Sequence, residues 1–298
     1  MAEPRAGSDA RRLPATATVQ GALKTAAECL QRAGIDQPKL AAEILVASAL
    51  NCPRLELYLR LNEKLAPAQI EAVRQGTRRL QKHEPIQYVI GRTDFMGHIL
   101  KCDQRGLVPR PETEELVEFV IGHKPFRQIE SPAVIDLGTG SGCIVVSLAL
   151  RNKNGKYWAV DVSRGATALA KENARVNNVA GIIKFLTADF TGRKMPSGMD
   201  AVVSNPPYVR TSDFNRLEKN VRLWEPRRAL DGGQDGLDII RPLIKKAHEI
   251  LKPGRFLFLE IGFDQWKQVR QLLAGAGFRQ SFLRRDRAGH PRLVMAVK

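Results

Sequence analysis

Short apolar segments alternate with helical segments from residue 133 to the C-terminus, and this order constrains the fold more than any other feature of the chain. Residues 133–137 have the composition of a buried strand, and residues 143–150 have the apolar spacing of a helix. Further strands are predicted at 157–162, 182–187, 201–204, 255–261, 278–283 and 293–297, with helices at 163–177, 237–251 and 265–274. Such alternation favours an α/β fold with a mostly parallel, doubly wound, Rossmann-like sheet. Ligands of these sheets bind beyond the carboxyl ends of the strands.

The first part of the chain has a helical pattern instead. Apolar residues recur at three- and four-residue spacing over 19–33, 38–50 and 67–82, with a shorter stretch at 55–59. Two buried stripes are predicted, one from Leu40, Ile44, Leu45 and Ala49 and one from Ile70, Val73, Thr77 and Leu80. We therefore predict four segments. They are a disordered tail over 1–18, a small helical-bundle domain over 19–84 that docks substrate or serves as scaffold, a hairpin linker over 85–111, and a catalytic domain over 112–298.

Composition excludes some classes of protein without identifying one. A hydrophobic fraction of 43% and a charged fraction of 26% are those of a globular protein. The chain has no apolar run of about 18 residues, so no membrane partner is predicted. The net charge of +16 favours acidic partners, but the arginines are spread along the chain, so composition alone does not identify the partner. We predict a monomer and no stable nucleic-acid partner. The four cysteines are widely separated, which argues against a metal site or a disulfide framework and favours the cytoplasm.

A glycine-rich loop, Asp-Leu-Gly-Thr-Gly-Ser-Gly over 136–142, follows the first predicted strand of the sheet. Alternate glycines allow positive φ and let the backbone approach a ligand. The third glycine comes one residue too early for a dinucleotide-binding loop, and no Gly-Lys-Ser/Thr follows for a Walker loop. Asp161 ends the next strand, where a carboxylate can accept hydrogen bonds from both ribose hydroxyls of an adenosine. Asp189 and Phe190 follow the third strand, where an acceptor and an apolar ring can flank an adenine.

Taken together, these three strand ends resemble those of the class I S-adenosylmethionine-dependent methyltransferases. The resemblance implies S-adenosyl-L-methionine as cofactor and S-adenosyl-L-homocysteine as product, with Asp136 reading the amino group of the cofactor directly or through water. The implied cofactor-binding residues are Asp136, Gly138, Thr139, Gly140, Ser141, Gly142, Asp161, Asp189, Phe190 and Asn205.

The fourth predicted strand leads into Asn205-Pro206-Pro207-Tyr208, which we predict to be the catalytic motif. Two prolines remove two backbone donors and leave carbonyl groups to face a site, and Asn205 adds a side-chain carbonyl. These acceptors can hold an NH₂ group, and Tyr208 offers a ring to a planar substrate. An amide nitrogen is a poor nucleophile, so catalysis there is positional and electrostatic and needs no strong base. The same tetrapeptide also resembles that of adenine-N6 methyltransferases, so the motif indicates planar NH₂ chemistry without naming the molecule that carries it.

Other segments carry more specific information. They are Glu84-Pro85-Ile86-Gln87-Tyr88 with Gly91, Phe95-Met96-Gly97, Val108-Pro109-Arg110-Pro111-Glu112-Thr113-Glu114, Glu225-Pro226-Arg227, Ala229-Leu230-Asp231-Gly232-Gly233 and Asp235-Gly236-Leu237-Asp238. From about residue 20 to the C-terminus, the chain resembles the release-factor glutamine N5-methyltransferases (HemK/PrmC type). Position 190 departs mildly from the family, with Phe where many relatives carry Trp. The chain also contains its own Gly-Gly-Gln at 232–234, which we interpret as coincidence.

The resemblance implies a substrate, namely the glutamine in the Gly-Gly-Gln loop of peptide-chain release factors. Residues 205–208 would hold this glutamine, and Arg110 and Glu112 would help to wall the site. Two alternatives stay open: the same chemistry on a ribosomal protein glutamine, and adenine-N6 methylation of nucleic acid. Flipped bases need an aromatic-lined groove, and an aromatic content of 6% argues against the second alternative.

Overall fold

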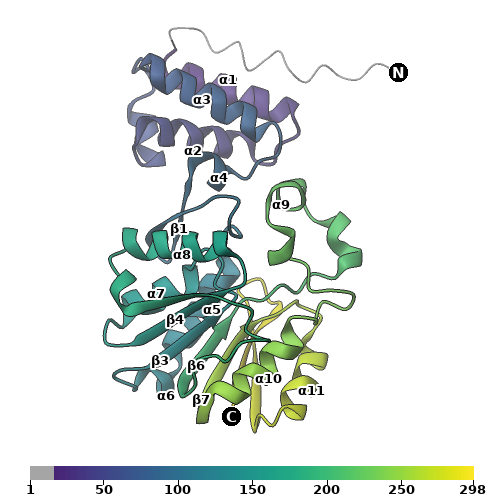
Figure 1. The fold of residues 1–298 in the computed structure, drawn as a ribbon. Helices are drawn as coiled ribbons and strands as arrows, with labels where there is room; N and C mark the ends of the chain where they lie inside the picture. The colour runs from purple at the N-terminus through teal and green to yellow at the C-terminus, as the bar shows by residue number, and fades with distance from the viewer. Residues whose placement is uncertain (1–16) are drawn as a thin grey trace. The chain divides into compact units, whose positions relative to one another are not determined.

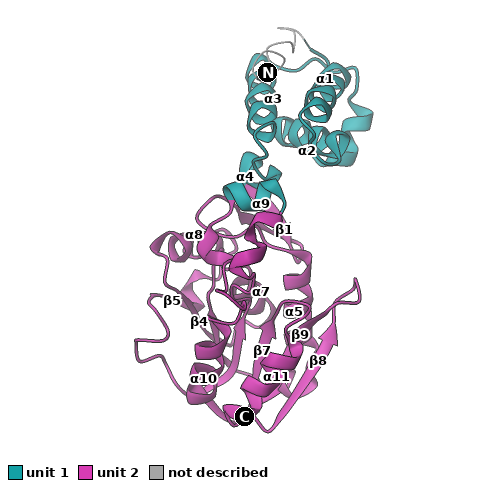
Figure 2. Ribbon diagram, turned by 90° about the vertical axis from the view of Figure 1, so that its right-hand side faces the viewer, with its two compact units in different colours: residues 1–91, 218–224 teal, residues 92–217, 225–298 magenta. Residues whose placement is uncertain are grey.

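The computed structural model describes residues 17–298, so the predicted tail over 1–18 lies almost wholly outside the described residues. The chain forms two compact units, which Figure 2 shows in different colours. Unit 1 takes the chain up to Gly91 together with residues 218–224, and unit 2 takes residues 92–217 and 225–298. Within unit 1, the indole Nε1 of Trp224 donates a hydrogen bond to the carbonyl oxygen of Lys82 at 2.9 Å. Nothing in the sequence pattern predicts this return of residues 218–224 to unit 1.

Unit 1 is a helical bundle, as its apolar spacing predicts. Thr18 caps the first helix, because its side-chain oxygen accepts a hydrogen bond from Gly21 N at 3.2 Å. Pro38 and Pro67 begin two other helices, where a backbone N–H would have no partner within the helix. The elements of unit 1 are α1 (Val19–Arg32), α2 (Pro38–Leu50), the 3-10 helix η2 (Arg54–Leu59), α3 (Pro67–Leu80), α4 (Ile86–Ile90) and α9 (Lys219–Trp224).

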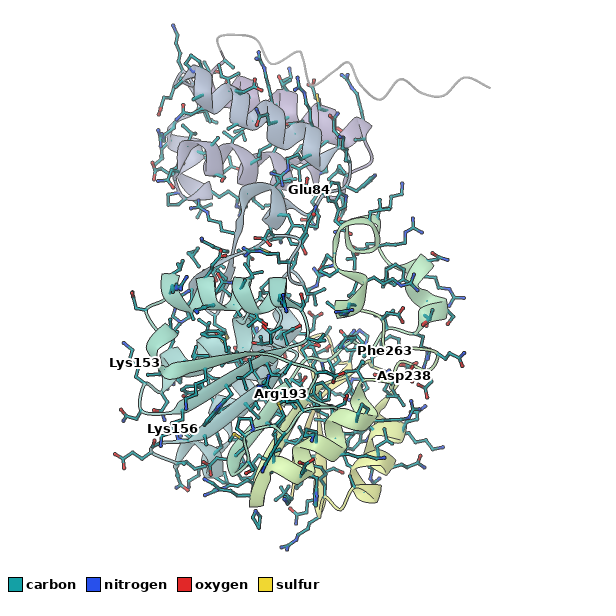
Figure 3. The ribbon with its side chains drawn as sticks, viewed as in Figure 1. Glu84, Lys153, Lys156, Arg193, Asp238 and Phe263 are labelled. Carbon is teal, nitrogen blue, oxygen red and sulfur yellow. The ribbon has the colours of Figure 1, made fainter. Side chains whose placement is uncertain are left out.

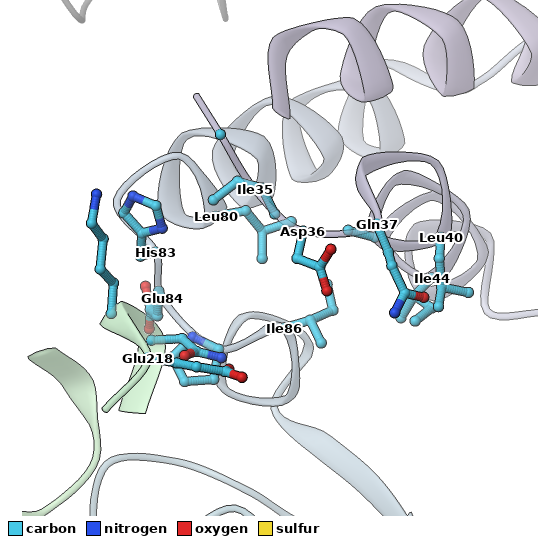
Figure 4. Close-up of a pocket in the computed structure, with 15 residues that line it drawn as sticks. Ile35, Asp36, Gln37, Leu40, Ile44, Leu80, His83, Glu84, Ile86 and Glu218 are labelled. Atoms are coloured by element: carbon cyan, nitrogen blue, oxygen red, sulfur yellow. The ribbon is translucent and has the colours of Figure 1, made fainter. Parts of the chain in front are cut away.

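The stripe predicted on α3 is confirmed, whereas the stripe predicted on α2 is confirmed only at Leu45. The buried residues of α3 include Ile70, Val73, Thr77 and Leu80. The buried residues of α2 are Ala42, Leu45, Val46, Ala47 and Leu50. The prediction for α2 is inaccurate because this helix is apolar on nearly every side, so the spacing of apolar residues alone cannot identify its buried face. Leu40 and Ile44 instead line an open groove of about 560 Å³ within unit 1, which Figure 4 shows.

The segment predicted as a hairpin linker, residues 85–111, is divided between the two units. Its first apolar run forms α4 in unit 1 rather than a strand. The hairpin itself consists of β1 (Arg92–Phe95) and β2 (His98–Lys101), which pair antiparallel in unit 2. Met96 and Gly97 have φ values of 55° and 77°. Two consecutive residues at positive φ make the tight turn whose twist matches that of the flanking strands.

Unit 2 carries, among the described residues, a seven-stranded sheet with the order β5-β4-β3-β6-β7-β9-β8. Strands β3 to β7 run parallel to one another, and β9 pairs antiparallel with both β7 and β8. The predicted α/β fold with a mostly parallel sheet is therefore confirmed. The strands are β3 (Ala133–Leu137), β4 (Lys156–Asp161), β5 (Ile183–Thr187), β6 (Met199–Ser204), β7 (Leu251–Glu260), β8 (Gln280–Arg285) and β9 (Pro291–Val297). The helices are α5 (Pro111–Gly122), α6 (Lys124–Arg127), α7 (Cys143–Arg151), α8 (Arg164–Val176), α10 (Ile240–Ile250) and α11 (Trp266–Gly275), with 3-10 turns η3 (Ala180–Ile182), η4 (Thr211–Arg216) and η5 (Arg227–Ala229).

Side chains along each strand alternate between two helical layers, which cover the two faces of the sheet (Figure 1). On β3, Val134 belongs to an apolar cluster with α5 and α7, whereas Ile135 and Leu137 belong to a second cluster with α10 and α11. The parallel strands end at one common edge, which is where the predicted site residues are expected. Among residues 17–298, no helix combines the length and the apolar character needed to cross a membrane.

Candidate active site

The glycine-rich loop joins β3 to α7 at the carboxyl edge of the sheet. Gly138 N donates to the carbonyl oxygen of Val160 at 2.8 Å. Gly138, Gly140 and Gly142 have φ values of 77°, 54° and 81°, a region that other residues enter only with strain. A Cβ at Gly142 would lie 2.9 Å from the Cβ of Ala170 on α8, whereas one at Gly140 would meet no atom within 4 Å. The loop therefore packs tightly against α8 at Gly142 and faces open space at Gly140.

Asp161 ends β4 and holds this loop with its carboxylate. Its Oδ2 accepts a hydrogen bond from Gly140 N at 2.9 Å, and its Oδ1 accepts one from Ser163 N at 2.8 Å. Burial raises the pKa of the carboxyl group, while these hydrogen bonds and the positive charge of Arg228 oppose the rise. Because each carboxylate oxygen can accept more than one hydrogen bond, this geometry is compatible with the predicted contact to ribose hydroxyls.

A cavity of about 570 Å³ opens in front of the loop, entirely within unit 2. This volume lies in the usual range for small-molecule sites, roughly 300–1,000 Å³. Its lining includes the predicted cofactor residues Gly138, Gly140, Asp161, Asp189, Phe190 and Asn205. Sequence reasoning assigned no cofactor contact to the segments that complete the wall, although Pro226, Ala229 and Asp238 lie in motifs quoted above. They supply Arg105, Gly106, Leu107, Pro226, Arg228, Ala229, Ile239 and Asp238, the last of which Figure 3 labels.

The other predicted cofactor residues, Asp136, Thr139, Ser141 and Gly142, do not line this cavity. Asp136 is fully buried, and its Oδ2 accepts a hydrogen bond from the Thr139 hydroxyl at 2.7 Å. Burial raises the pKa of Asp136 to about 7, and the hydrogen bond from Thr139 opposes the rise. Its Oδ1 meets no donor with good hydrogen-bond geometry among residues 17–298. A buried acceptor without a donor calls for an explanation, and an amino group of a bound cofactor, acting directly or through water, fits it.

Asp189 and Phe190 follow β5 and take part in the cavity wall. Asp189 Oδ1 accepts hydrogen bonds from the backbone N–H and the hydroxyl of Thr191, at 2.8 and 2.6 Å. The hydrogen bond from the Thr191 hydroxyl is the main reason that the pKa of Asp189 is lowered. Phe190 is half-buried and packs against the apolar cluster on the α10 face of the sheet. The pair thus presents a fixed carboxylate next to an aromatic ring.

Asn205 follows β6 and belongs to a buried hydrogen-bond network that the sequence did not predict. Asn205 Nδ2 donates to Thr113 Oγ1 at 2.9 Å, and the Thr113 hydroxyl donates to Glu260 Oε2 at 2.8 Å. The Tyr208 hydroxyl donates to the other oxygen, Glu260 Oε1, at 3.2 Å. Burial raises the pKa of Glu260 to about 7, and the hydrogen bonds from Thr113 and Tyr208 oppose the rise. A carboxylate that ends the apolar strand β7 was the available signal for Glu260, and Thr113 lies within the quoted Pro-Arg-Pro-Glu-Thr-Glu motif.

The two prolines of the predicted catalytic motif have different surroundings. Pro206 is buried, whereas Pro207 lines the cavity. The carbonyl oxygen of Pro207 lies against Gly232, where an added Cβ would come within 2.8 Å of it. Tyr208 does not line the cavity, and its backbone carbonyl accepts a hydrogen bond from Gln265 Nε2 at 3.0 Å. Of the two proline carbonyls, that of Pro206 is therefore the better candidate for a substrate contact.

Arg110 and Glu112, predicted to wall the substrate site, lie at the start of α5. Arg110 forms an ion pair with Glu225, whose side chain is 1% exposed and which also accepts a hydrogen bond from Val108 N at 3.0 Å. This pair fixes the segment that continues from the cavity wall. Glu112 is half-buried. Burial is the main reason that the pKa values of Glu260 and Tyr208 are raised, and the charge of Glu112 adds to both rises. Substrate binding by Arg110 and Glu112 remains a prediction. In the described part of the chain, no group of three or more His, Cys, Asp or Glu side chains is arranged to hold a metal ion.

A mostly parallel sheet with a glycine loop, an acidic residue at the end of the next strand and an Asn-Pro-Pro-Tyr motif after β6 defines an S-adenosylmethionine-dependent methyltransferase. In agreement, residues 120–221 match the family described as the methyltransferase small domain, and residues 21–91 match the PrmC N-terminal domain. The chain is 38% identical to the release factor glutamine methyltransferase of Moorella thermoacetica, over 94% of this chain and 99% of that relative. It is 36% identical to that of Caulobacter vibrioides, over 95% and 97%. The chain belongs to the release factor glutamine methyltransferase family.

Solved structures support the same fold at greater distance. The hMettl16 catalytic domain superimposes with a TM-score of 0.53 and 18% identity, covering 76% of this chain and 82% of that one. A methyltransferase from Pyrococcus furiosus superimposes with a TM-score of 0.50 and 17% identity, covering 68% and 90%. At such low identity the similarity concerns the fold alone.

Proposed function

We propose that the protein transfers a methyl group from S-adenosyl-L-methionine to the side-chain amide nitrogen, N5, of the glutamine in the Gly-Gly-Gln loop of peptide-chain release factors. One observation carries the proposal. Asn205 lines the cofactor cavity, and Thr113 engages its amide NH₂ group from behind, so Oδ1 remains as a hydrogen-bond acceptor. An acceptor at this place suits a substrate NH₂ group. The names of the relatives, release factor glutamine methyltransferase, point to the molecule that carries it.

The cofactor would be held along the carboxyl edge of β3, β4 and β5. Gly138 and Gly140 lack side chains and so let the cofactor approach the backbone. Asp161 accepts hydrogen bonds from its ribose hydroxyls, and Phe190 packs against its adenine. Asp136 is fully buried and does not line the cavity, so it would accept from the amino group of the cofactor through water at Oδ1, which meets no donor with good hydrogen-bond geometry among residues 17–298. When bound, S-adenosyl-L-methionine supplies an electrophilic methyl group and leaves as S-adenosyl-L-homocysteine.

The residues of the chain then have to orient a weak nucleophile. Asn205 Oδ1 and the Pro206 carbonyl oxygen would each accept one hydrogen of the glutamine NH₂ group, because the Pro207 carbonyl oxygen lies close to Gly232, where an added Cβ would come within 2.8 Å of it. Two acceptors fix the nitrogen in line and favour the positive charge that develops on it. No histidine lines this cavity, whose wall is fully described, so the amide proton is proposed to leave to water after transfer.

The test is transfer of a radiolabelled methyl group to a purified release factor, with the loop glutamine intact or changed to alanine. Label on the intact factor alone is the expected result and identifies both the acceptor and its residue. Equal label on both would reject the loop glutamine. Label on a ribosomal protein or on nucleic acid, with none on either release factor, would keep the chemistry and reject the substrate.

A monomeric state, the absence of a stable nucleic-acid partner and a cytoplasmic location are also proposed. The dispersed basic residues support the second of these proposals, and the widely spaced cysteines support the third. Sedimentation of the purified protein with and without RNA tests the first two.

A further inference from the structure

The side-chain amide of Asn205 can adopt two orientations, and its own structure does not favour either one. A carboxamide has two ends of nearly equal shape, one an acceptor and the other a double donor. Rotation by about 180° exchanges these ends with almost no change in the space filled. Only the orientation that presents Oδ1 to the cavity can receive a substrate NH₂ group. The site therefore needs neighbours that distinguish the two ends.

Thr113 provides a directional contact because its hydroxyl has a single hydrogen. That hydrogen goes to Glu260 Oε2 at 2.8 Å, so the hydroxyl oxygen can act only as an acceptor towards Asn205. Asn205 Nδ2 lies 2.9 Å from that oxygen. In the rotated orientation Oδ1 would face the same oxygen with no hydrogen between them. Thr113 is 2% exposed, so water cannot readily replace the lost hydrogen bond.

Glu260 sets the direction of the Thr113 hydroxyl in turn. It is 1% exposed, and both of its oxygens accept hydrogen bonds from hydroxyl groups, those of Thr113 and Tyr208. Because each oxygen of Glu260 accepts from a different hydroxyl group, the single hydrogen of the Thr113 hydroxyl points to Glu260 and away from Asn205. The chain of contacts joins three elements, α5, β7 and the loop after β6, and all of its residues lie in unit 2.

We propose that Thr113 and Glu260 are positioning residues that fix the amide of Asn205 with its oxygen towards the substrate. The inference rests on the proposed function, because it assumes that the substrate presents an NH₂ group to Asn205. Neither residue is proposed to touch the substrate. Their effect is on the fraction of enzyme whose Asn205 amide faces the cavity in the productive sense.

The first experiment replaces the Thr113 hydroxyl while keeping the volume of the side chain. Thr113→Val removes the acceptor, and Thr113→Ser keeps it. Thr77→Val is the matched control, because Thr77 is equally buried, lies in unit 1, and donates only to the carbonyl of Val73 within α3. For each variant, kcat and KM for methylation of a purified release factor, the Kd for S-adenosyl-L-methionine and the thermal midpoint are measured.

We expect Thr113→Val to lower kcat on the order of 10- to 100-fold, since a misdirected acceptor misaligns the nucleophile. The Kd for cofactor should stay within about twofold, because Thr113 does not line the cofactor cavity. Thr113→Ser should recover most of the lost kcat, and Thr77→Val should lose none. A kcat for Thr113→Val equal to that of wild type, or equally low in Thr113→Ser, would overturn the inference. So would a loss that parallels weaker cofactor binding.

Glu260→Gln tests the second residue, and a double-variant cycle tests the route of action. The neutral amide can still offer an oxygen to Thr113 but no longer compels its direction, so kcat should fall less than in Thr113→Val. In an Asn205→Ala background, followed by mass spectrometry of the product over long incubations, Thr113→Val should cause no further loss. An additive loss would mean that Thr113 acts by another route. Failure of wild type to label the release factor would reject the proposed function itself, which is a different result from wild-type activity with no effect of Thr113→Val.

Discussion

Two glycines of the cofactor loop, Gly142 and Gly140, should respond differently to the same change to alanine. The change at Gly142 should mainly lower stability, and the change at Gly140 should mainly weaken cofactor binding. Gly142→Ala meets two obstacles. Its φ of 81° is strained for any side chain, at about 1–2 kcal/mol. Its Cβ would also lie 2.9 Å from Ala170 Cβ and 3.0 Å from Ala170 Cα, and forcing such a contact costs roughly 1–3 kcal/mol. We therefore expect Gly142→Ala to destabilise the protein by about 2–5 kcal/mol.

Gly140→Ala meets only the first obstacle. Its φ is 54°, but a Cβ there would find no atom within 4 Å. The expected loss of stability is about 1–2 kcal/mol. Because Gly140 lines the cavity, the added methyl group occupies space that the cofactor needs. Gly140→Ala should therefore weaken cofactor binding more than Gly142→Ala does, although it should unfold at a higher temperature than Gly142→Ala.

Differential scanning calorimetry and isothermal titration with S-adenosyl-L-methionine measure the two effects separately. For a unit of this size each kcal/mol shifts the midpoint by about 2–4 °C, so Gly142→Ala should melt about 4–20 °C below wild type. The reasoning is refuted if both variants melt at the same temperature. It is also refuted if Gly142→Ala loses cofactor affinity while Gly140→Ala keeps it.

Three further predictions concern the same unit. The pKa of Asp136 is raised to about 7 from 3.8, so the folded state keeps a proton that the unfolded state has lost. Stability without cofactor should therefore fall as pH rises from about 4 to 7, and Asp136→Asn should flatten this fall in urea unfolding at several pH values. Asp161→Asn should raise the Kd for S-adenosyl-L-methionine about 10- to 100-fold, since hydrogen bonds to a charged group are involved; an unchanged Kd in calorimetry would contradict the assigned ribose contact. Gln234 should carry no methyl group in mass spectra of protein incubated with cofactor, because packing alone accounts for the glycines before it: a Cβ at Gly232 would meet Gly236 O at 2.7 Å, and one at Gly233 would meet Asp238 Oδ2 at 1.8 Å. A methylated Gln234 would contradict the interpretation of this Gly-Gly-Gln sequence as coincidence and would show that the protein can methylate itself.

Local patterns were sufficient for most of the sheet and its helices. β3 has the predicted bounds, Ala133–Leu137, because a short apolar run between polar turns leaves little choice. Ser163, the first residue of the helix predicted at 163–177, caps α8, and its side chain accepts a hydrogen bond from Ala166 N at 3.2 Å. The predicted helix at 237–251 is the less accurate case. The structure begins α10 at Ile240 and gives Leu251 to β7, since an apolar residue at such a boundary satisfies either element.

The parts that sequence missed depend on contacts between distant segments. Thr113 contacts Glu260 across 147 residues and Asn205 across 92 residues. The Glu225 side chain reaches Arg110 across 115 residues. Each of these residues occupies an ordinary local position, such as the first turn of a helix or the polar end of a strand. Only the register of the sheet brings them together, and no spacing along the chain encodes that register.

The return of residues 218–224 to unit 1 has a consequence for modularity. Contacts assign the chain to unit 1 up to Gly91, to unit 2 from Arg92, to unit 1 again at Glu218 and back to unit 2 at Glu225. A cut after Gly91 would part Trp224 from the Lys82 carbonyl that its indole contacts. The helical unit is therefore not a contiguous cassette that recombination can move in one piece. A graft onto another methyltransferase would have to carry a second short insert within the recipient's own sequence, so the two units are expected to be inherited together.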